Sequence, residues 1–279
     1  MSYADKLFKE TCRDILENGT DTKGQLVRPK WEDGAPAYTI KKFGVVNRYD
    51  LRKEFPAITI RQTYLKSCMD EMLWIYQKKS NNIKDLHSHI WDQWADEDGS
   101  IGTVYGYQVA EKFMLNGKET DQMDNVLNQL KNKPYSRRIM TNLYQFHNLD
   151  KGHLDPCCYS MTYNVTCENG DLVLNAVLNQ RSQDMLSANG WNISEYAILL
   201  MMVAQSVNMI PGELVHVIAD AHIYDRHVPI IKELLEREEY PAPKVSLNPE
   251  VKDFYKFTTD DLIVEDYKFG EQVKFPVAE

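Results

Sequence analysis

The sequence predicts a single α/β domain, in which a large, mostly antiparallel or mixed β-sheet is flanked by helices. Stretches with apolar residues at helical spacing are interspersed with stretches in which every second residue is apolar. The 279 residues are 43% hydrophobic, enough to bury a sizeable core. We find no repeat, low-complexity tract or composition break that would mark a linker. Residues 1–279 are therefore expected to form one domain.

The helices follow from apolar periodicity and from residues that start or stop a helix. Residues 2–18 place apolar side chains on one face and end before Asn18-Gly19, which is typical of a helix C-terminus. Ser194 is expected to be the N-cap of a largely apolar helix that reaches about Met209 and is buried on most sides. Further helices are expected over residues 62–77, 120–132 and 229–238.

The strands follow from alternation and turn residues. Residues 158–166 alternate, with Tyr159, Met161, Tyr163 and Val165 predicted on one face and Cys158, Ser160, Thr162 and Asn164 on the other. Glu168-Asn169-Gly170-Asp171 then provides a hairpin turn into a strand over residues 172–178. Two more strands are expected over residues 38–46 and 213–220.

Charge and cysteine content limit the function classes. The net charge of −9 argues against binding the phosphate backbone of a nucleic acid, so an anionic ligand must meet a local group of arginines. The five cysteines are an odd number without CxxC spacing, which favours reduced thiols. The N-terminus carries charges where a signal peptide would be apolar, and no apolar run approaches membrane-spanning length. We expect a cytoplasmic protein with no membrane partner.

Asp155-Pro156-Cys157-Cys158 places a cysteine between a proline-fixed approach and the start of a strand, a suitable position for a nucleophile. Such a residue is otherwise a small buried hydrophobe. Arg137-Arg138 lie upstream of the cysteine, and Arg181 lies downstream at the end of the hairpin's second strand. Guanidinium groups near a thiol would lower its pKa and could clamp a phosphate, whereas surface salt bridges are the alternative interpretation.

Five blocks of sequence resemble thymidylate synthases in the same order, and the resemblance runs from the first predicted helix to the last residue. The stretch from Arg137-Arg138-Ile139 to Leu154-Asp155-Pro156-Cys157-Cys158 resembles the active-site signature of that family. The other four blocks are Gln180-Arg181-Ser182-Gln183-Asp184, Trp191-Asn192-Ile193, Asp220-Ala221-His222-Ile223-Tyr224 and Pro276-Val277-Ala278.

The resemblance implies a methyltransferase that converts dUMP to dTMP. Its co-substrate would be 5,10-methylenetetrahydrofolate, which donates both the one-carbon unit and the hydride and leaves as dihydrofolate. The resemblance also implies a homodimer whose sheets pack back to back. Neither a metal nor NAD(P) is expected, and the chain has no GxGxxG motif, P-loop or zinc-type spacing. A pyrimidine nucleotide hydroxymethylase of the same family, which uses water in place of hydride, is the alternative.

The catalytic roles are likewise those that the resemblance implies. Cys157 would attack carbon 6 of uracil, because carbon 5 is otherwise a poor nucleophile. Asn192 would read N3 and O4 of the ring, and Tyr105 would assist removal of the carbon 5 proton. Glu71, on the edge of an apolar helical stripe, is expected to be partly buried with a raised pKa and to relay protons through water. Asp184 is expected to contact both the nucleotide and the pterin.

The remaining expected contacts concern phosphate, ribose and folate. Arg181 and Ser182 match phosphate contacts from the same subunit, whereas Arg137 and Arg138 match a pair that reaches in from the partner subunit. His222 and Tyr224, two apart on a strand or its end, suit two hydrogen bonds to the ribose. Gln180 completes the dUMP set. The folate would meet a wall of Ile90, Trp91, Trp94, Leu154, Leu186 and Trp191, with Val277-Ala278-Glu279 closing over it.

Two positions depart from the family's usual pattern. The residue after the nucleophile is commonly histidine, but here it is Cys158, so a hydrogen bond usually made there must be replaced by water or dropped; Cys158 is also the alternative thiol. The N-terminal phosphate loop is longer than usual, with Arg28 as the candidate phosphate contact well before Phe43-Gly44.

Overall fold

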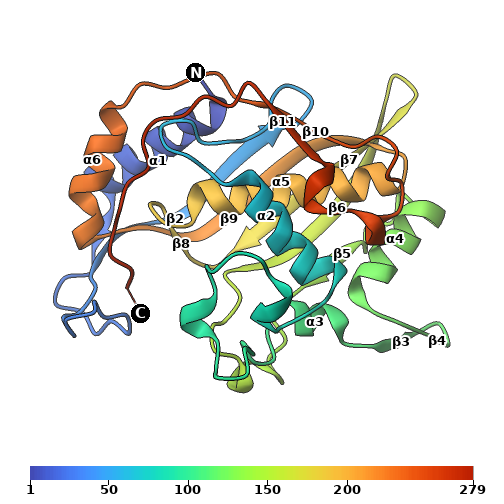
Figure 1. Ribbon diagram of the computed structural model, residues 1–279, viewed down its shortest axis with the longest axis horizontal. Helices are drawn as coiled ribbons and strands as arrows, with labels where there is room; N and C mark the ends of the chain where they lie inside the picture. Colours follow the sequence, from blue (N-terminus) through green and yellow to red (C-terminus); the bar gives the residue numbers. More distant parts are fainter. Residues whose placement is uncertain (279) are drawn as a thin grey trace.

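A computed structural model describes residues 1–278, so Glu279, the last residue of the expected tail, lies outside the described residues. The main sheet has the order β1-β2-β9-β7-β6-β5, with β8 paired to β9 (Figure 1). Only β7–β9 and β8–β9 are parallel pairs, so the predicted mixed, mostly antiparallel sheet is confirmed. The strands are β1 Thr20–Asp21, β2 Thr39–Asp50, β5 Met140–Asn142, β6 Cys158–Glu168, β7 Asp171–Gln180, β8 Gln183–Asp184 and β9 Ile210–Tyr224.

Two small antiparallel ribbons, β3 with β4 and β10 with β11, lie outside the main sheet and were not predicted. They comprise Phe113–Leu115, Lys118–Thr120, Lys244–Leu247 and Leu262–Glu265. The α-helices are α1 Tyr3–Asn18, α2 Leu65–Met72, α3 Gly106–Ala110, α4 Gln122–Asn132, α5 Asn189–Ser206 and α6 Val228–Glu236. A π-helical turn, Leu73–Gln77, continues α2, and 3-10 turns span Ile83–Asp85, Asp92–Trp94, Leu149–Lys151, Asp225–His227, Phe254–Lys256 and Thr259–Asp261.

The β6–β7 hairpin turns at Asn169 and Gly170, as predicted. Both residues have positive φ, 54° and 96°, as a two-residue hairpin turn that matches the strand twist requires. The predicted faces are wrong at the other end of β6, because a bulge between Cys158 and Ser160 inserts Tyr159 as an extra residue. Cys158 therefore pairs with Gln180 and is buried, whereas Tyr159 is only half-buried. One extra residue reverses the alternation at the strand's start.

The prediction that Ser194 caps the long apolar helix is wrong, because α5 already begins at Asn189. The Ser194 hydroxyl instead donates to the Gly190 carbonyl within the helix, at 2.8 Å. A Cβ at Gly190 would lie 2.8 Å from Ile58 Cγ1, so glycine permits close packing here. The earlier start places Trp191 in the first turn of α5.

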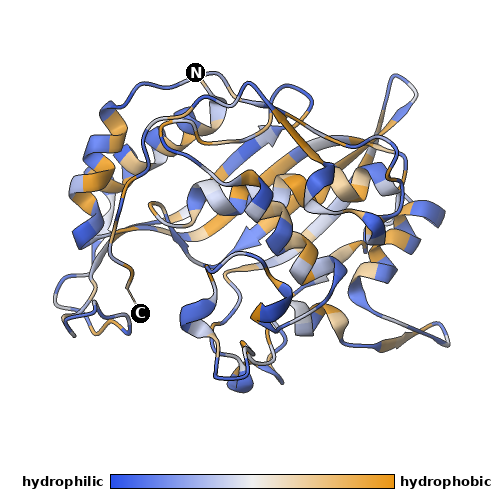
Figure 2. Ribbon diagram, in the orientation of Figure 1, coloured by the Kyte–Doolittle hydropathy of each residue, from blue (hydrophilic) through white to orange (hydrophobic). Residues whose placement is uncertain are grey.

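The helices form layers on one face of the sheet. α5 packs on β7 and β9, α2 packs on α5, and α1 packs on β2 (Figures 1 and 2). As predicted, α5 is apolar on most sides, and its buried residues include Ile198, Leu199, Leu200, Met202 and Val203, each with no exposed surface. Within residues 1–278, no helix has both the length and the apolar character to cross a membrane.

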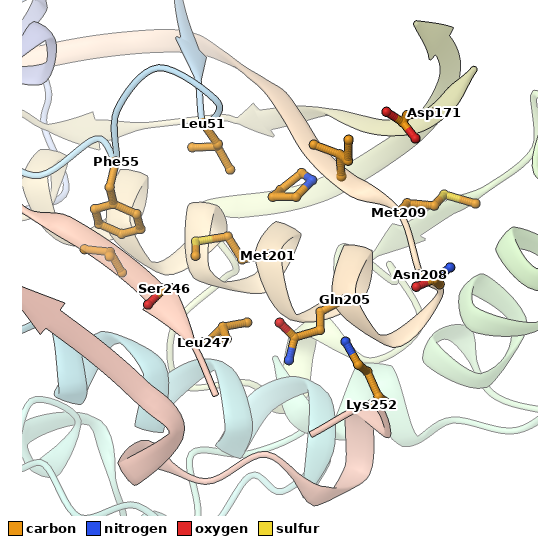
Figure 3. Close-up of a pocket in the computed structure, with 13 residues that line it drawn as sticks. Leu51, Phe55, Asp171, Met201, Gln205, Asn208, Met209, Ser246, Leu247 and Lys252 are labelled. Atoms are coloured by element: carbon orange, nitrogen blue, oxygen red, sulfur yellow. The ribbon is translucent and has the colours of Figure 1, made fainter. Parts of the chain in front are cut away.

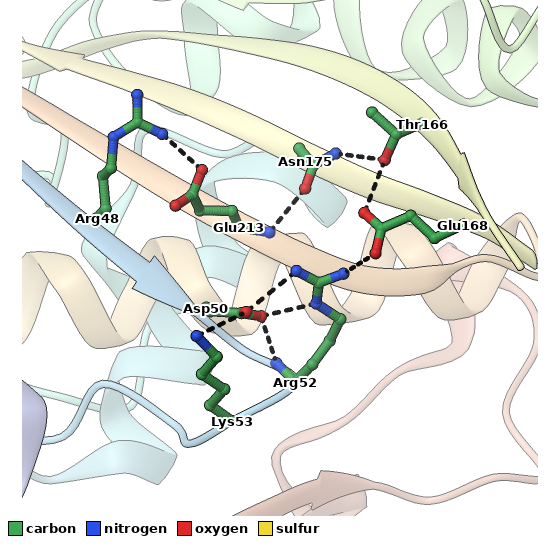
Figure 4. A network of polar contacts seen from close by, with 8 residues as sticks. All are labelled: Arg48, Asp50, Arg52, Lys53, Thr166, Glu168, Asn175 and Glu213. Carbon is green, nitrogen blue, oxygen red and sulfur yellow. Dashed lines mark hydrogen bonds and ion pairs between the residues drawn. The ribbon is translucent and has the colours of Figure 1, made fainter.

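The opposite face of the sheet is open. The register aligns Val46, Val217, Val215 and Val177 on neighbouring strands of this face; Val46 is 55% exposed and the others are half-buried. A polar network closes one end of the same face (Figure 4). It includes ion pairs from Arg48 to Glu213 at 2.7 Å and from Arg52 to Asp50 at 2.7 Å and Glu168 at 2.5 Å. An apolar strip with a charged rim is typical of a surface that another layer covers.

Candidate active site

Cys157 lies immediately before β6, in a loop that Arg181 holds. The Arg181 amide donates to the Cys157 carbonyl at 2.9 Å, Nε donates to the Pro156 carbonyl at 3.0 Å, and Nη2 donates to the Asp155 carbonyl at 2.7 Å. Nη2 also lies 3.6 Å from Cys157 Sγ. The structure therefore brings Arg181 and the predicted nucleophile together, and two backbone carbonyls and the sulfur constrain the guanidinium.

The pKa of the Cys157 thiol is raised, which differs from the direction that its arginine neighbours alone would give. Burial has the largest effect and raises the pKa, the positive charge of Arg181 lowers it, Asp155 raises it and Arg28 lowers it. Burial outweighs the two cations because the thiolate loses its hydration. The thiol is thus held protonated in this state, and the arginines reduce the cost of ionising it.

Tyr105 bridges the thiol loop and the aromatic cluster around Trp91. Its hydroxyl accepts from the Cys157 amide at 3.4 Å, and its ring centroid lies 4.8 Å from that of Trp91. Burial raises the pKa of Tyr105, so the phenol is neutral. Its φ of 51° is unusual for a residue with a side chain, and such backbone strain is concentrated at functional sites.

Glu71 lies at the end of α2 and receives two indole hydrogen bonds. Trp91 Nε1 donates to its Oε1 and Trp191 Nε1 donates to its Oε2, each at 2.9 Å. The carboxyl is buried, as the helical stripe predicts. Burial raises the pKa of Glu71, whereas the hydrogen bonds from Glu195, Trp191 and Trp91 act in the opposite direction. A carboxyl with a raised pKa is suited to proton transfer near neutral pH.

Asn192 sits in the first turn of α5 with its amide fixed by hydrogen bonds. Gln180 Nε2 donates to Asn192 Oδ1 at 3.0 Å, and Asn192 Nδ2 donates to Glu195 Oε2 at 3.0 Å. Gln180 is oriented in turn by His216, whose Nε2 donates to Gln180 Oε1 at 2.7 Å. Burial lowers the pKa of His216 to about 3, so the imidazole is neutral. This series of hydrogen bonds defines which side of the Asn192 amide is the acceptor.

Sequence reasoning missed Glu195, which joins this chain to Glu71. It lies on α5, one turn after Asn192, and is 2% exposed. Burial and the neighbouring Glu71 raise the pKa of Glu195 well above its usual value. The one available signal was an acidic residue within a helix that is otherwise almost entirely apolar, three positions after a predicted site residue.

The predicted phosphate residues divide into two groups. Arg181 lies beside Cys157, the half-buried Ser182 follows it in the chain, and Arg28 is close enough to lower the pKa of both Cys157 and Tyr224. Arg137 and Arg138 are exposed on the loop before β5, and neither forms an ion pair with any acidic residue between positions 1 and 278. The structure thus brings Arg28 to the candidate site. It shows no binding partner for the side chains of Arg137 and Arg138 within residues 1–278.

His222 and Tyr224 lie at the end of β9, with ring centroids 5.1 Å apart. His222 Nδ1 lies 2.9 Å from Asp220 Oδ1, and β8 aligns Asp184 directly beside His222. Burial and then Asp184 raise the pKa of Tyr224 to about 12. The predicted ribose residues and Asp184 therefore share one edge of the site.

Asp184 is a half-buried carboxylate whose pKa is lowered. Burial opposes its charge, but a hydrogen bond and the charge of His227, together with His222 and Ser187, outweigh burial. Ser187 Oγ donates to Asp184 Oδ2 at 2.6 Å, and the Leu186 amide donates to Oδ1 at 2.9 Å. Asp184 thus remains an ionised acceptor on the wall of the site.

The predicted folate wall is partly solvent-accessible. Trp94, Leu154 and Trp191 are half-buried, Ile90 is exposed, and Trp91 is buried with its ring 5.4 Å from that of Trp94. Leu186 has no exposed side-chain surface, and its carbonyl accepts a hydrogen bond from Arg61. These aromatic and aliphatic groups stand next to the Glu71 and Asp184 carboxyls, an arrangement that suits a flat heterocycle with N–H donors.

The C-terminal tail reaches this edge of the site. His227 Nε2 donates to the Pro276 carbonyl at 2.8 Å, and the Phe275 ring centroid lies 5.6 Å from that of His227. Arg61 Nη1 donates to Gln272 Oε1 at 3.4 Å. The half-buried Ala278 is the last described residue of the expected lid.

A separate pocket of about 520 Å³ lies away from these residues. It is formed by the turn after β2, the end of α5, the start of β9 and β10 (Figure 3). None of the predicted site residues lines it. Across residues 1–278, no three His, Cys, Asp or Glu side chains are arranged to hold a metal ion.

Comparison with known proteins gives one consistent result. The thymidylate synthase family model matches residues 6–279. Curated relatives that align over their whole length and over all of this chain include thymidylate synthases of Bacillus mojavensis, 42% identical, and Clostridium beijerinckii, 39% identical. A solved structure, the thermostable thymidylate synthase A from Bacillus subtilis, matches with a TM-score of 0.92 and 40% identity, and each chain is fully covered.

Proposed function

The chain belongs to the thymidylate synthase family, and we propose that it catalyses the reductive methylation of dUMP to dTMP at the site around Cys157. The observation that carries this proposal is the continuous set of contacts from the Arg181-bound thiol, through Tyr105, to the Glu71 and Asn192 polar chain. The comparisons support this activity and not the hydroxymethylase alternative.

Cys157 acts as the nucleophile that adds to carbon 6 of the uracil ring. The addition makes carbon 5 nucleophilic, because the ring becomes an enolate. Arg181 stabilises the thiolate, since it lies 3.6 Å from the sulfur and is fixed in place by backbone carbonyls. The resting thiol is protonated, so ionisation accompanies nucleotide binding rather than preceding it.

Asn192 recognises uracil through its fixed amide. Oδ1 already accepts from Gln180 and retains a second lone pair for N3–H, and Nδ2 donates to Glu195 and retains a second hydrogen for O4. Uracil satisfies both groups. Cytosine presents an acceptor at N3, facing Oδ1, and a donor at position 4, facing Nδ2. Neither pair can form a hydrogen bond, so cytosine is rejected.

Glu71 and Tyr105 handle the protons. The raised pKa of Glu71 allows it to exchange protons with the ring through ordered water near neutral pH. The Tyr105 hydroxyl, beside the Cys157 amide, is placed to assist removal of the carbon 5 proton. Arg28, Arg181 and Ser182 bind the phosphate, and His222 with Tyr224 binds the ribose.

The residues present fit a reduced folate. The aromatic wall supplies flat apolar contact, and the ionised Asp184 supplies an acceptor for pterin N–H groups. The folate supplies the one-carbon unit and the hydride when bound. The tail from Gln272 to Ala278 is held by Arg61 and His227, and it closes the site and excludes water. Methyl transfer requires this exclusion of water, whereas hydroxymethylation uses water as a reactant.

A homodimer accounts for two features of the fold. The open face, with Val46, Val177, Val215 and Val217 aligned on three strands, suits packing against the same face of a second copy. Arg137 and Arg138, which are exposed and form no ion pair within residues 1–278, would then reach the phosphate site of the partner. A cytoplasmic location agrees with the five cysteines, which are all free thiols.

Dihydrofolate formation tests the proposed activity. Purified protein is mixed with methylenetetrahydrofolate and either dUMP or dCMP, and absorbance of dihydrofolate is followed. Formation with dUMP alone is expected. Consumption of dUMP without dihydrofolate would instead establish hydroxymethylation, and no reaction with either nucleotide would overturn the proposal.

A further inference from the structure

The proposed mechanism gives Glu195 no role, although this residue contacts both Asn192 and Glu71. It lies on α5, which packs against α2, and Glu71 is the titratable side chain that raises its pKa. The charge of Glu195 in turn raises the pKa of four further neighbours, Cys68, Cys158, Tyr76 and Tyr196. All of these groups are neutral or negative. A second negative charge in this enclosed space would be strongly unfavourable.

The hydrogen bonds indicate where a proton lies. Glu195 Oε2 accepts from Asn192 Nδ2 at 3.0 Å. Glu195 Oε1 is buried and receives no hydrogen bond from any donor between residues 1 and 278, yet it belongs to a carboxyl in hydrogen-bonding contact with Glu71. Both Glu71 oxygens already accept from indole N–H groups. Two carboxylates repel each other, whereas a carboxylic acid and a carboxylate form a hydrogen bond. A proton on Glu195 Oε1 therefore gives each of the four carboxyl oxygens of Glu71 and Glu195 a hydrogen bond.

The two pKa directions agree with this assignment. Burial and the contact with Glu71 raise the pKa of Glu195 well above its usual value. Burial also raises the pKa of Glu71, but three hydrogen bonds act to lower it. The proton therefore resides on Glu195 and the negative charge on Glu71.

We propose that Glu195 is a positioning residue, a neutral carboxylic acid that donates to Glu71 and accepts from Asn192, and that it thereby enforces selection of uracil over cytosine. The roles of Glu71 and Asn192 rest on the proposed function. Rotation of the Asn192 amide by half a turn would present the pattern that fits cytosine. That rotation is prevented because Gln180 donates to one side of the amide and Glu195 accepts from the other.

Two substitutions separate hydrogen bonding from mere volume. Glu195→Gln has nearly the same shape and can accept from Asn192 while its amide donates to Glu71, but it carries no acidic proton. Glu195→Met fills similar space and makes neither bond. Glu239→Gln is the matched control, because Glu239 is a largely buried glutamate in an ion pair with Lys9, at 2.8 Å, remote from the thiol loop.

The three variants are compared with wild type by kcat, by KM for dUMP, and by the ratio of the dissociation constants for dCMP and dUMP. Glu195→Gln and the control are expected to keep kcat within about fivefold and to keep the dissociation-constant ratio. Glu195→Met is expected to lose about a hundredfold in kcat and at least about tenfold in that ratio, with a melting temperature near wild type. An inactive Glu195→Gln, or a Glu195→Met protein that still discriminates fully, would overturn the inference.

Infrared difference spectroscopy reads the proton directly. Wild type minus Glu195→Gln at pH 7 is expected to show the C=O stretch of a buried carboxylic acid, and a carboxylate stretch in its place would overturn the assignment. This measurement and the dissociation-constant ratio require no turnover. If wild type forms no dihydrofolate, the proposed function fails, whereas the inference about Glu195 is still decided by these two results.

Discussion

His227 joins Asp184 to the C-terminal tail. Its Nδ1 lies 3.4 Å from Asp184 Oδ2, while its Nε2 donates to the Pro276 carbonyl at 2.8 Å. The imidazole is buried, and burial alone would lower its pKa, but the hydrogen bond and charge of Asp184 and the Pro276 carbonyl outweigh burial and raise it. When it is protonated, the ring carries an N–H at each nitrogen, so it can link the Asp184 carboxylate to the C-terminal tail.

The first prediction concerns the pH dependence of this link. Because the folded pKa of His227 is raised, the stabilisation is fully present below the usual value of 6.5 and is lost as pH rises through the higher folded value. His227→Gln can still donate to Pro276 but cannot become charged. Its tail amides are expected to exchange hydrogen about fivefold faster than wild type at pH 6, equivalent to about 1 kcal/mol, and at the wild-type rate at high pH. An equal difference at both pH values would contradict this link.

The second prediction separates the two adjacent cysteines. Cys157→Ala is expected to fold and dimerise but to lose at least about a thousandfold in kcat, because no covalent bond to carbon 6 can form. Cys158→Ala is expected to retain turnover, since the bulge turns Cys158 into the core face, where it is 5% exposed. Intact-mass measurement of a nucleotide adduct checks both. An adduct on Cys157→Ala protein would assign the nucleophile to the other thiol.

The third prediction tests the electrostatic role of Arg181. Its charge lowers the pKa of Cys157 against the effect of burial, so Arg181→Met should raise that pKa further. Iodoacetamide alkylation of Cys157 is therefore expected to need a higher pH than in wild type. Arg13→Met is the control, because Arg13 is exposed on α1 and is not among the charges that act on the Cys157 thiol. Equal alkylation profiles for the two variants would contradict an Arg181-specific effect.

Local sequence patterns predicted the sheet and most helices because those patterns report burial directly. The Asn169-Gly170 turn, the α1 stripe and the apolar α5 segment each depend on neighbouring residues alone. The β6 bulge and the start of α5 depend on tertiary packing instead. Gly190 lies in the first turn of α5, where a Cβ would meet Ile58 at 2.8 Å, and no local propensity encodes such a tertiary contact.

The candidate site shows the same division. Cys157 and Asn192 could be predicted because their sequence blocks resemble a known family, and Glu71 because it lies on the edge of an apolar helical stripe in a chain with that resemblance. Glu195 could not, because its importance arises from the packing of α5 against α2, which brings it to Glu71 although the two residues are 124 positions apart in the chain. The raised thiol pKa was also missed, since sequence shows the charged neighbours but not the burial that outweighs them.

The last prediction compares two glycines. A Cβ at Gly106 would lie 2.0 Å from the Ser80 carbonyl oxygen and 2.6 Å from the Ser80 nitrogen, and both are backbone atoms that cannot rotate away. Gly106→Ala should therefore cost about 3 kcal/mol and displace the adjacent Tyr105, so kcat falls as well. Gly170 has a φ of 96° with open space around it, so Gly170→Ala should cost only about 1 kcal/mol and leave kcat unchanged. Urea unfolding and the dihydrofolate assay measure both effects. Equal stability of the two variants would show that the chain around Ser80 can move aside, and Tyr105 would then not depend on this close approach for its position.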